Sequence, residues 1–352
     1  HHNMERRVAL VAGATGLIGR RLAAHLQRLG WEVIGLCRRP VPGAAVPLIG
    51  VDLTDLANCR SKLAGLEDVT HVFYTARYDH PEGVTESVDI NAAMLRNLVE
   101  ALEPVAGGLR HVHAVHGTKY YGHHVGPIAV PAREDDPRAA APNFYYLQED
   151  TLRERQRGKR WTYSTSRPHT YCDASWSEPR NIGLLIAVYA AVLRELGLPL
   201  GYPGTAKSFR VATQFTALPL LARALAWMAT EPRCANQAYN IVNGDAPRWS
   251  ELWPRFAAYF GMQAGPEQPV RLADTMADRE GVWQAVIRKH GLRPTALQSL
   301  VLWSYGNYVF APEWDIISDG SKARSHGFAG TVNSTKMFLD IFEFLRAEKI
   351  VP

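Results

Sequence analysis

Cysteine is scarce in this sequence, and none of it stands in a CxxC pair. The 352 residues include four widely separated cysteines, Cys37, Cys59, Cys172 and Cys234. A disulfide framework or a zinc ribbon is therefore not expected, and this usage is typical of a reduced, cytoplasmic protein. His1-His2-Asn3 looks like the remnant of a purification tag before a natural start at Met4, and no signal peptide is expected.

Long apolar runs and blocks of like charge are also missing. The apolar run Ile182–Leu193 is too short to cross a bilayer, so stable membrane insertion is not expected. We predict a core helix there, with a substrate-pocket wall or a shallow membrane contact as alternatives. The net charge is +5, but the basic residues are scattered, which argues against nucleic-acid binding. Since 47% of the residues are hydrophobic, a large folded core is expected.

Up to about Pro168, the sequence alternates short β-rich runs with amphipathic stretches. The predicted strands are Arg7–Ala12, Glu32–Leu36, His71–Thr75, His111–Val115 and Trp161–Arg167. The predicted helices between them include Arg20–Leu29, Asn91–Leu102 and Glu149–Arg157. This alternation predicts a parallel sheet that is covered by helices on both faces.

Beyond Pro168 the alternation stops and aromatic residues, mostly expected in the core, become frequent. Helices are predicted at Ile182–Leu196, Phe215–Thr230, Trp249–Phe260, Thr275–His290 and Thr335–Glu348. A further strand is predicted at 238–242. The predicted fold is α/β: a doubly wound (Rossmann) parallel sheet over residues 4–170, to which the strand near 238–242 returns. A smaller, mainly helical substrate lobe is interleaved over residues 171–352.

A glycine-rich turn follows the first predicted strand and opens a helix. Gly13, Gly16 and Gly19 are its three glycines. The first permits a tight turn, the second lets the backbone approach a pyrophosphate, and the third lets helix and strand pack closely. The helix N-terminus would face the phosphate charge. We predict a dinucleotide site here, with an ordinary glycine-rich turn as the alternative.

The end of the second predicted strand lacks the acidic residue that usually binds the ribose of NAD. Arg38 and Arg39 stand there, and a guanidinium pair suits the 2′-phosphate of NADP. We therefore predict NADPH/NADP+ as the cofactor, with a pair of surface arginines as the alternative. Asp52 either accepts from the adenine amino group or caps a helix begun by Leu53. The predicted cofactor contacts are Gly13, Thr15, Gly16, Leu17, Ile18, Gly19, Arg38, Arg39, Asp52, Leu53, Thr75, Ala76, Val115, Tyr146, Pro168 and Thr170.

The YxxxK motif of short-chain dehydrogenases is missing as well. Tyr146 is the best candidate for its tyrosine, but Asp150 stands four residues later, on the same side of a helix. A carboxylate there would raise the pKa of the phenol and disfavour a phenolate. Gly117 stands where the usual serine would be. Two residues on, Lys119 could supply the missing positive charge from the end of another strand.

Five histidines, His111, His113, His116, His123 and His124, suggest a metal site. His111 and His113 could share one strand face, but no partner at a familiar ligand spacing accompanies them. We therefore predict strand and loop histidines and no metal.

Five segments match one known pattern: Lys119–Gly122, Asn143–Asp150, Tyr239–Asp245, Ser325–Gly330 and Lys349–Pro352. They resemble the progesterone 5β-reductase/iridoid synthase-like 1,4-enone reductases (the PRISE group), atypical extended short-chain dehydrogenase/reductases, and the resemblance spans nearly the whole chain. In that group a lysine and a tyrosine at these positions stabilise an enolate as NADPH adds hydride to the β-carbon.

The resemblance implies an NADPH-dependent enone or enal reductase with Lys119 and Tyr146 as catalytic residues. A protonated tyrosine can donate to an enolate without becoming a base. Tyr145 takes the role if the register is one residue off. The alternatives are a carbonyl reductase or epimerase of the same fold, which would need YxxxK, and a non-catalytic NADP-binding or sensing protein.

Two departures from the group concern the substrate, for which we expect a small apolar carbonyl compound. His169 and Thr170 stand within the segment that corresponds to the group's RPGNIFG, and His116 replaces a threonine. The predicted pocket residues are His116, Tyr145, His169, Tyr308 and Trp314. The helix Asn91–Leu102 could pack against a second copy in a homodimer, but its pattern equally suits a helix that covers the sheet.

Overall fold

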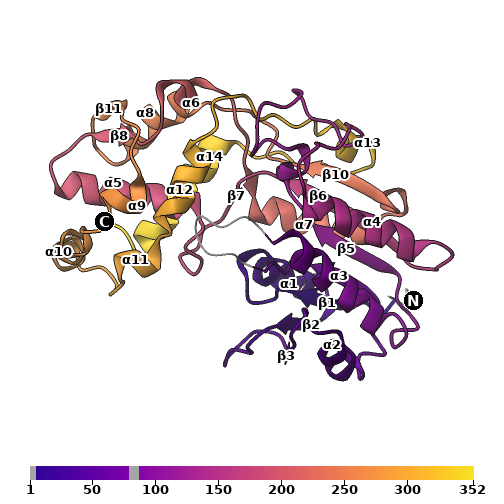
Figure 1. Ribbon diagram of the computed structural model, residues 1–352. Helices are drawn as coiled ribbons and strands as arrows, with labels where there is room; N and C mark the ends of the chain where they lie inside the picture. The colour runs from indigo at the N-terminus through magenta and orange to yellow at the C-terminus, as the bar shows by residue number, and fades with distance from the viewer. Residues whose placement is uncertain (1–4, 79–86) are drawn as a thin grey trace.

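The computed structural model describes residues 5–78 and 87–352, so His1–Met4, the suggested tag remnant and start, lies outside the described residues. A seven-stranded sheet organises the first half of the chain (Figure 1). Its strands are β1 (Val8–Ala12), β2 (Glu32–Cys37), β3 (Leu48–Gly50), β4 (His71–Tyr74), β5 (His111–Val115), β6 (Thr162–Pro168) and β10 (Gln237–Ile241). They lie in the order β10-β6-β5-β4-β1-β2-β3, with every neighbouring pair parallel. The predicted doubly wound parallel sheet and its returning strand are confirmed.

Helices cover both faces of this sheet. One face carries α1 (Leu17–Arg28) and α7 (Leu218–Thr230), and the other carries α2 (Leu56–Leu63), α3 (Val88–Leu102) and α4 (Phe144–Gln156). Alternate residues of a strand point to opposite faces. In β1, Ala9 and Val11 therefore join the cluster that includes α1 and α7, and Leu10 joins the cluster beneath α3. This two-sided burial explains why the strand is apolar throughout.

The second half forms a mainly helical lobe beside the sheet (Figure 1). Its longer helices are α5 (Ile182–Glu195), α8 (Trp249–Tyr259), α10 (Glu280–His290), α12 (Trp303–Phe310) and α14 (Ser334–Ala347). Its short elements are β7 (Tyr171–Cys172), β8 (Leu200–Tyr202), α6 (Ala206–Arg210), β9 (Thr216–Ala217), η2 (Pro232–Cys234), β11 (Ala264–Glu267), α9 (Leu272–Thr275), α11 (Leu297–Leu300) and α13 (Ser321–Ser325). A one-turn 3₁₀ helix, η1 (Thr118–Tyr121), follows β5.

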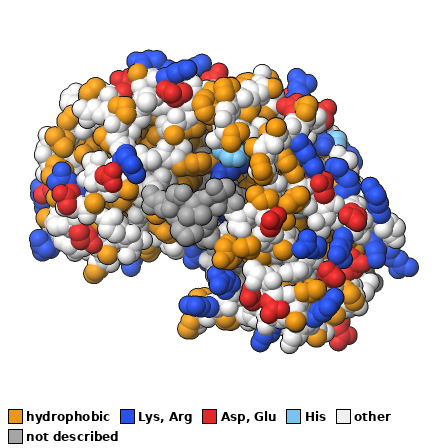
Figure 2. All heavy atoms as spheres, viewed as in Figure 1, with side chains coloured by type: hydrophobic (Ala, Val, Ile, Leu, Met, Phe, Trp, Pro, Cys, Tyr) orange, Lys and Arg blue, Asp and Glu red, His pale blue; other side chains and the backbone are white. Residues whose placement is uncertain are grey.

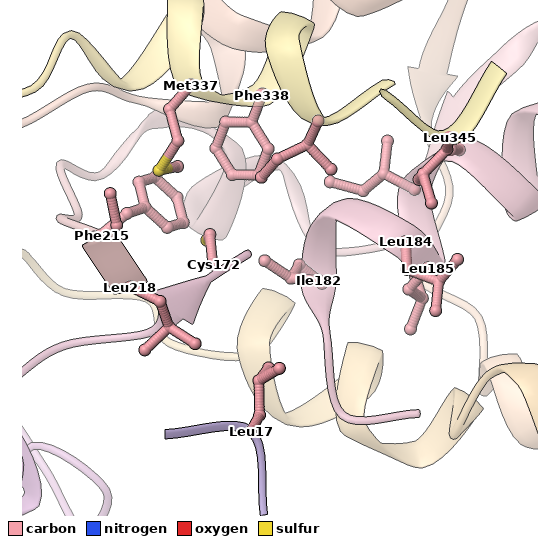
Figure 3. Close-up of a cluster of buried hydrophobic side chains, with 14 of the residues drawn as sticks. Leu17, Cys172, Ile182, Leu184, Leu185, Phe215, Leu218, Met337, Phe338 and Leu345 are labelled. Atoms are coloured by element: carbon pink, nitrogen blue, oxygen red, sulfur yellow. The ribbon is translucent and has the colours of Figure 1, made fainter. Parts of the chain in front are cut away.

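The apolar run Ile182–Leu193 is a core helix, as predicted. All its residues are buried within α5. Figure 3 shows Ile182, Leu184 and Leu185 with side chains of α14, of the start of α7 and of the start of α1. No helix in the described part of the chain is both long and apolar enough to span a bilayer.

Most of the second-half tryptophans belong to the core, as expected. Trp249, Trp253, Trp283 and Trp303 are at most 3% exposed. Charged side chains of both signs are interspersed over the face shown in Figure 2. The proposed division after residue 170 stays a prediction, and α7, which lies beyond it, packs against α1, β5 and β6 of the sheet.

Candidate active site

A cleft of about 1560 Å³ opens at the carboxyl ends of the strands, where the two halves of the chain meet. This is the edge at which parallel α/β sheets bind ligands. Its lining from the sheet half includes Gly13, Thr15, Gly16, Leu17, Ile18, Gly19, Arg38, Arg39, Asp52, Leu53, Thr75, Ala76, Pro168 and Thr170. These predicted cofactor contacts therefore lie together. Val115 and Tyr146, also predicted as contacts, do not line the cleft.

The glycine-rich turn has the backbone geometry of a phosphate cradle. Gly13 has a φ of +78°, and a Cβ there would lie 2.7 Å from Thr75 Oγ1. A Cβ on Gly19 would overlap the carbonyl of Gly13. Gly16 is the N-cap of α1 and has no side chain to satisfy the first N–H groups. These donors are therefore left to a ligand, and anions bind well at such helix ends.

Asp52 does not cap a helix. Its side chain accepts from Thr54 N at 3.0 Å and from Thr54 Oγ1 at 2.6 Å. The helix that follows, α2, begins at Leu56, and its cap is Asp55, whose carboxylate accepts from Asn58 N. The prediction of a cap for a helix begun by Leu53 is therefore wrong, whereas Asp52 itself lies in the cleft wall.

The structure distinguishes the two adjacent tyrosines by their position relative to the cleft. Tyr145 lines the cleft, whereas Tyr146 is buried away from it. The Tyr146 hydroxyl donates to the carbonyl of Tyr120 at 2.5 Å and accepts from Ala139 N at 2.9 Å. Successive helix residues point about 100° apart, so only one of the two rings can face the cleft. The structure therefore places Tyr145, the alternative for a register one residue off, in the cleft wall, and leaves Tyr146, predicted to meet substrate and cofactor, outside it.

Glu149, four residues after Tyr145, occupies the place of the usual lysine. It is buried and accepts from Tyr120 Oη and from Arg138 Nη2, both at 2.7 Å. Burial acts to raise the pKa of Glu149, but the hydrogen bonds from Arg138 and Tyr120 outweigh it and hold that pKa below its ordinary value. Asp150, expected to act on a catalytic phenol, pairs instead with Arg138 at 2.8 Å. Neither carboxylate takes part in the cleft.

Lys119 reaches the cleft from η1, directly after β5. Its ammonium lies 5.0 Å from the centroid of the Tyr308 ring. Its backbone carbonyl accepts from Asn143 Nδ2 at 2.9 Å, and Asn143 Oδ1 in turn caps α4 at Tyr145 N. The cap thus ties the backbones of Lys119 and Tyr145 together. A Cβ on Gly117 would lie 3.4 Å from the Tyr145 hydroxyl, so this phenol stands where the usual serine would be.

Three histidines line the same part of the cleft. His116 stacks on Tyr145, with ring centroids 4.5 Å apart. Thr118 Oγ1 lies 2.7 Å from His169 Nδ1 and 3.0 Å from His123 Nε2. Thr118 and His123 were not predicted as site residues, and no spacing in the sequence indicates them, because the contact depends on how β6 lies beside η1.

The lobe contributes cleft residues that, with the exception of Tyr308, the sequence did not indicate. They are Tyr171, Glu178, Arg180, Arg271, Ala273, Leu302, Ser304, Tyr305, Asn307, Tyr308 and Ala311. Trp314 instead borders a small adjacent pocket, and its indole N–H donates to the carbonyl of His123 at 3.1 Å. Most of this wall is polar or aromatic.

His111 and His113 are committed to the sheet. His111 contacts Thr162 Oγ1 and Ser164 Oγ, and His113 contacts Ser164 Oγ and Ser166 Oγ, at 2.7–2.9 Å. These contacts form one ladder between β5 and β6. Among residues 5–78 and 87–352, no group of three or more metal-ligating side chains is placed to hold an ion.

A family model described as the PRISE-like Rossmann-fold domain matches residues 49–352 of the chain. The chain belongs to the PRISE family. The match begins after the glycine-rich turn, so the evidence for that turn comes from its own geometry. The resemblance seen in the sequence is confirmed over most of the chain.

Curated relatives of this PRISE protein cover almost its whole length. One is a 3-oxo-Δ(4,5)-steroid 5β-reductase of Arabidopsis thaliana, 34% identical over 98% of this chain and 93% of the relative. Another is an (S)-8-oxocitronellyl enol synthase of Camptotheca acuminata, 32% identical over 98% and 93%. The PRISE chain is thus an oxidoreductase of the short-chain dehydrogenase/reductase superfamily.

Solved structures show the same fold at lower identity. A putative epimerase from Burkholderia cenocepacia has a TM-score of 0.66 at 20% identity and covers 97% of this chain and 99% of its own. A short-chain dehydrogenase/reductase from Agrobacterium tumefaciens, solved with bound NAD, has a TM-score of 0.67 at 15% identity and covers 97% and 98%.

Proposed function

We propose that this PRISE protein reduces the C=C bond of an enone or enal with NADPH, and that Tyr145 and Lys119 hold the enolate oxygen. The single observation that carries the proposal is that both side chains line the same cleft, together with Pro168 and Thr170. The two plant relatives, named for a steroid 5β-reductase and an enol synthase, support it.

The cleft suits a phosphorylated dinucleotide. Gly13–Gly19 would hold the pyrophosphate, Arg38 and Arg39 would hold the 2′-phosphate, and Asp52 would accept from the adenine amino group. NADPH, when bound, supplies a hydride. Pro168 and Thr170, at the end of β6, would bound the nicotinamide end of the site.

Tyr145 and Lys119 act on the substrate oxygen. Negative charge develops on that oxygen as the β-carbon is reduced. The Tyr145 hydroxyl donates a hydrogen bond and the Lys119 ammonium adds a positive charge, so both interactions strengthen as the reaction proceeds. Preorganised donors of this kind contribute about 10²–10³-fold in rate each. Neither residue needs to remove a proton from the substrate.

The residue at the lysine position weakens the first alternative, a carbonyl reductase or epimerase. Those reactions need a tyrosine activated by a lysine on the same helix, and here that place holds Glu149, which is committed to Arg138 and Tyr120. The second alternative, a non-catalytic NADP-binding protein, does not account for Tyr145 and Lys119 in one wall.

The test follows NADPH oxidation with a panel of enones, enals and saturated ketones. We expect turnover of the conjugated substrates and saturation of their C=C bond in the product. Turnover of ketones alone would contradict the proposal, and turnover of neither class would favour the binding protein. Tyr145→Phe and Lys119→Met should each lower kcat/KM for enones by about 10²–10³-fold.

Tyr146→Phe is the matched control. It removes a hydroxyl from the neighbouring ring, which bonds only to backbone groups in the described structure. We expect a lower melting temperature, because a net hydrogen-bond contribution of about 1 kcal/mol is lost, with kcat/KM within a few-fold of the parent. A loss of activity in Tyr146→Phe but not in Tyr145→Phe would instead identify Tyr146 as the catalytic tyrosine.

A further inference from the structure

The orientation of His116 is fixed by two buried neighbours. Gln148 Nε2 donates to the backbone carbonyl of Asn91 at 3.0 Å. Because a carbonyl can only accept, the amide nitrogen of Gln148 must face Asn91, and its oxygen, Oε1, faces His116. His116 Nε2 lies 3.0 Å from this oxygen and therefore donates to it.

This tautomer leaves the other ring nitrogen of His116 as an acceptor. Burial lowers the pKa of His116 to about 4, so the ring is neutral near pH 7 and Nδ1 keeps its lone pair. Nδ1 is buried and has no hydrogen-bond partner among the described residues. The side chain is only 4% exposed, yet it forms part of the cleft wall. A buried acceptor without a partner is destabilising, and a ligand that donates a hydrogen bond to it would remove that cost.

We propose that His116 Nδ1 accepts a hydrogen bond from a hydroxyl group of the substrate, so that the enzyme prefers enones bearing a hydroxyl next to the carbonyl. This inference rests on the proposed function for the place of the carbonyl. His116 stacks on Tyr145 with centroids 4.5 Å apart, so its acceptor lies within a few ångströms of the proposed oxyanion site. The hydroxyl would then stand on the carbon next to the carbonyl carbon.

The polar wall of the lobe agrees with an oxygenated substrate. Ser304, Tyr305 and Asn307 of α12 line the cleft together with Tyr171. The Asn307 amide is bonded to the backbone of Val270 and Leu272, so the hydroxyl groups of Ser304 and Tyr305 are the polar groups of α12 offered to a substrate oxygen. An enone with further oxygens could form hydrogen bonds with them. His116 is then a specificity-determining residue that recognises the donor nearest the reacting carbonyl.

The first experiment needs no variant and no turnover. An α-hydroxy cyclohexanone and its methyl ether are titrated into the complex with NADP+, and the two dissociation constants are compared by calorimetry. The ether keeps the oxygen and replaces the donor hydrogen by a methyl group, whose added bulk the ratio in His116→Phe controls for. We expect the hydroxyl compound to bind about tenfold tighter or more. Equal constants would overturn the inference, whether or not the protein reduces enones.

The second experiment measures kcat/KM for an α′-hydroxy cyclohexenone and for its methyl ether. The ratio should be about ten or more in the parent protein and fall toward one in His116→Phe, which keeps a ring to stack on Tyr145. His290→Phe, which changes an exposed histidine of α10, is the matched control and should keep the parent ratio.

Two outcomes separate this inference from the proposed function. If neither enone is reduced, the proposed function fails, and the binding comparison still tests the acceptor. If His116→Phe keeps the parent ratio, the inference fails. If the variant also weakens NADPH binding in the absence of substrate, the donor to Nδ1 belongs to the cofactor amide.

Discussion

Arg38 and Arg39 stand side by side in sequence at the end of β2 and both line the cleft. At the scale of single residues they are the basis of the proposed preference for NADPH, because charged hydrogen bonds to phosphate are strong and directional. Asp52 lies close enough to Arg38 for the arginine's charge to contribute to a lowered pKa of that carboxyl, although hydrogen bonds from Thr54 are the main cause. The adenine end of the site therefore combines two cations with one acceptor.

Replacing both arginines, Arg38→Met with Arg39→Met, should raise KM for NADPH by about 10–100-fold and change KM for NADH little. Initial rates with each cofactor at fixed enone give the two constants. Arg60→Met on α2, which removes an arginine paired with Glu100 on the surface, is the control. An equal rise for both cofactors would mean that the pair does not bind the 2′-phosphate.

The sequence predicted the pair of catalytic residue types but not which of two adjacent tyrosines faces the ligand. Local patterning could have located the start of α4, because Asn143 is a favoured N-cap residue and caps α4 at Tyr145 N. The predicted helix began at Glu149, five residues after the observed start at Phe144. Which of the two rings faces the cleft depends on contacts with η1 and with the backbone near Ala139, and no local sequence signal reveals these contacts.

At the scale of elements, β5 and β6 are joined by the ladder of imidazoles and hydroxyls described above. Burial is the main cause that lowers the pKa of His111 to about 3, and His113 is shifted in the same direction. Both rings are therefore neutral in the folded protein at pH values where the unfolded chain, with an ordinary pKa of 6.5, is protonated. Acid then favours the unfolded state.

The free energy of unfolding should be constant above about pH 7 and fall between about pH 6.5 and pH 3. Each such histidine contributes a slope of about 1.4 kcal/mol per pH unit. Urea unfolding at several pH values measures it. His111→Gln should unfold more easily at pH 7 but show a shallower slope, while His290→Gln should keep the parent slope. A parent slope in His111→Gln would show that other groups cause the acid sensitivity.

At the scale of the whole molecule, the cleft is built from both halves of the chain. Its wall runs from Gly13 to Ala311 in sequence. A ligand in it contacts the sheet, η1 and α12 at once, so binding should stabilise the two halves together. NADPH at 100 times its dissociation constant should add about 2.7 kcal/mol, or about 3–4 °C in melting temperature for a chain of 352 residues.

Thermal melts with equal concentrations of NADPH and NADH measure this effect. One cooperative transition that shifts as a unit, with the larger shift for NADPH, is expected. A shift confined to part of the unfolding transition, or an equal shift for both cofactors, would contradict it.

The sheet could be predicted from the sequence because its strands are short, β-rich and evenly alternated with helices. The lobe wall could not. Ser304, Tyr305 and Asn307 reach the cleft only because α12 packs against α5 and α9, a tertiary contact with no local periodicity of its own.

The late return of α7 and β10 to the sheet has a consequence for synthesis. Domains generally fold as units while the ribosome adds residues. The face of β5 and β6 stays uncovered until Leu218–Thr230 has emerged, and the seventh strand is missing until Ile241 has followed. A nascent chain stalled near residue 170 would therefore expose the histidine and serine side chains that β5 and β6 present on this face, so the ladder between them should become protected from water only in the last third of translation.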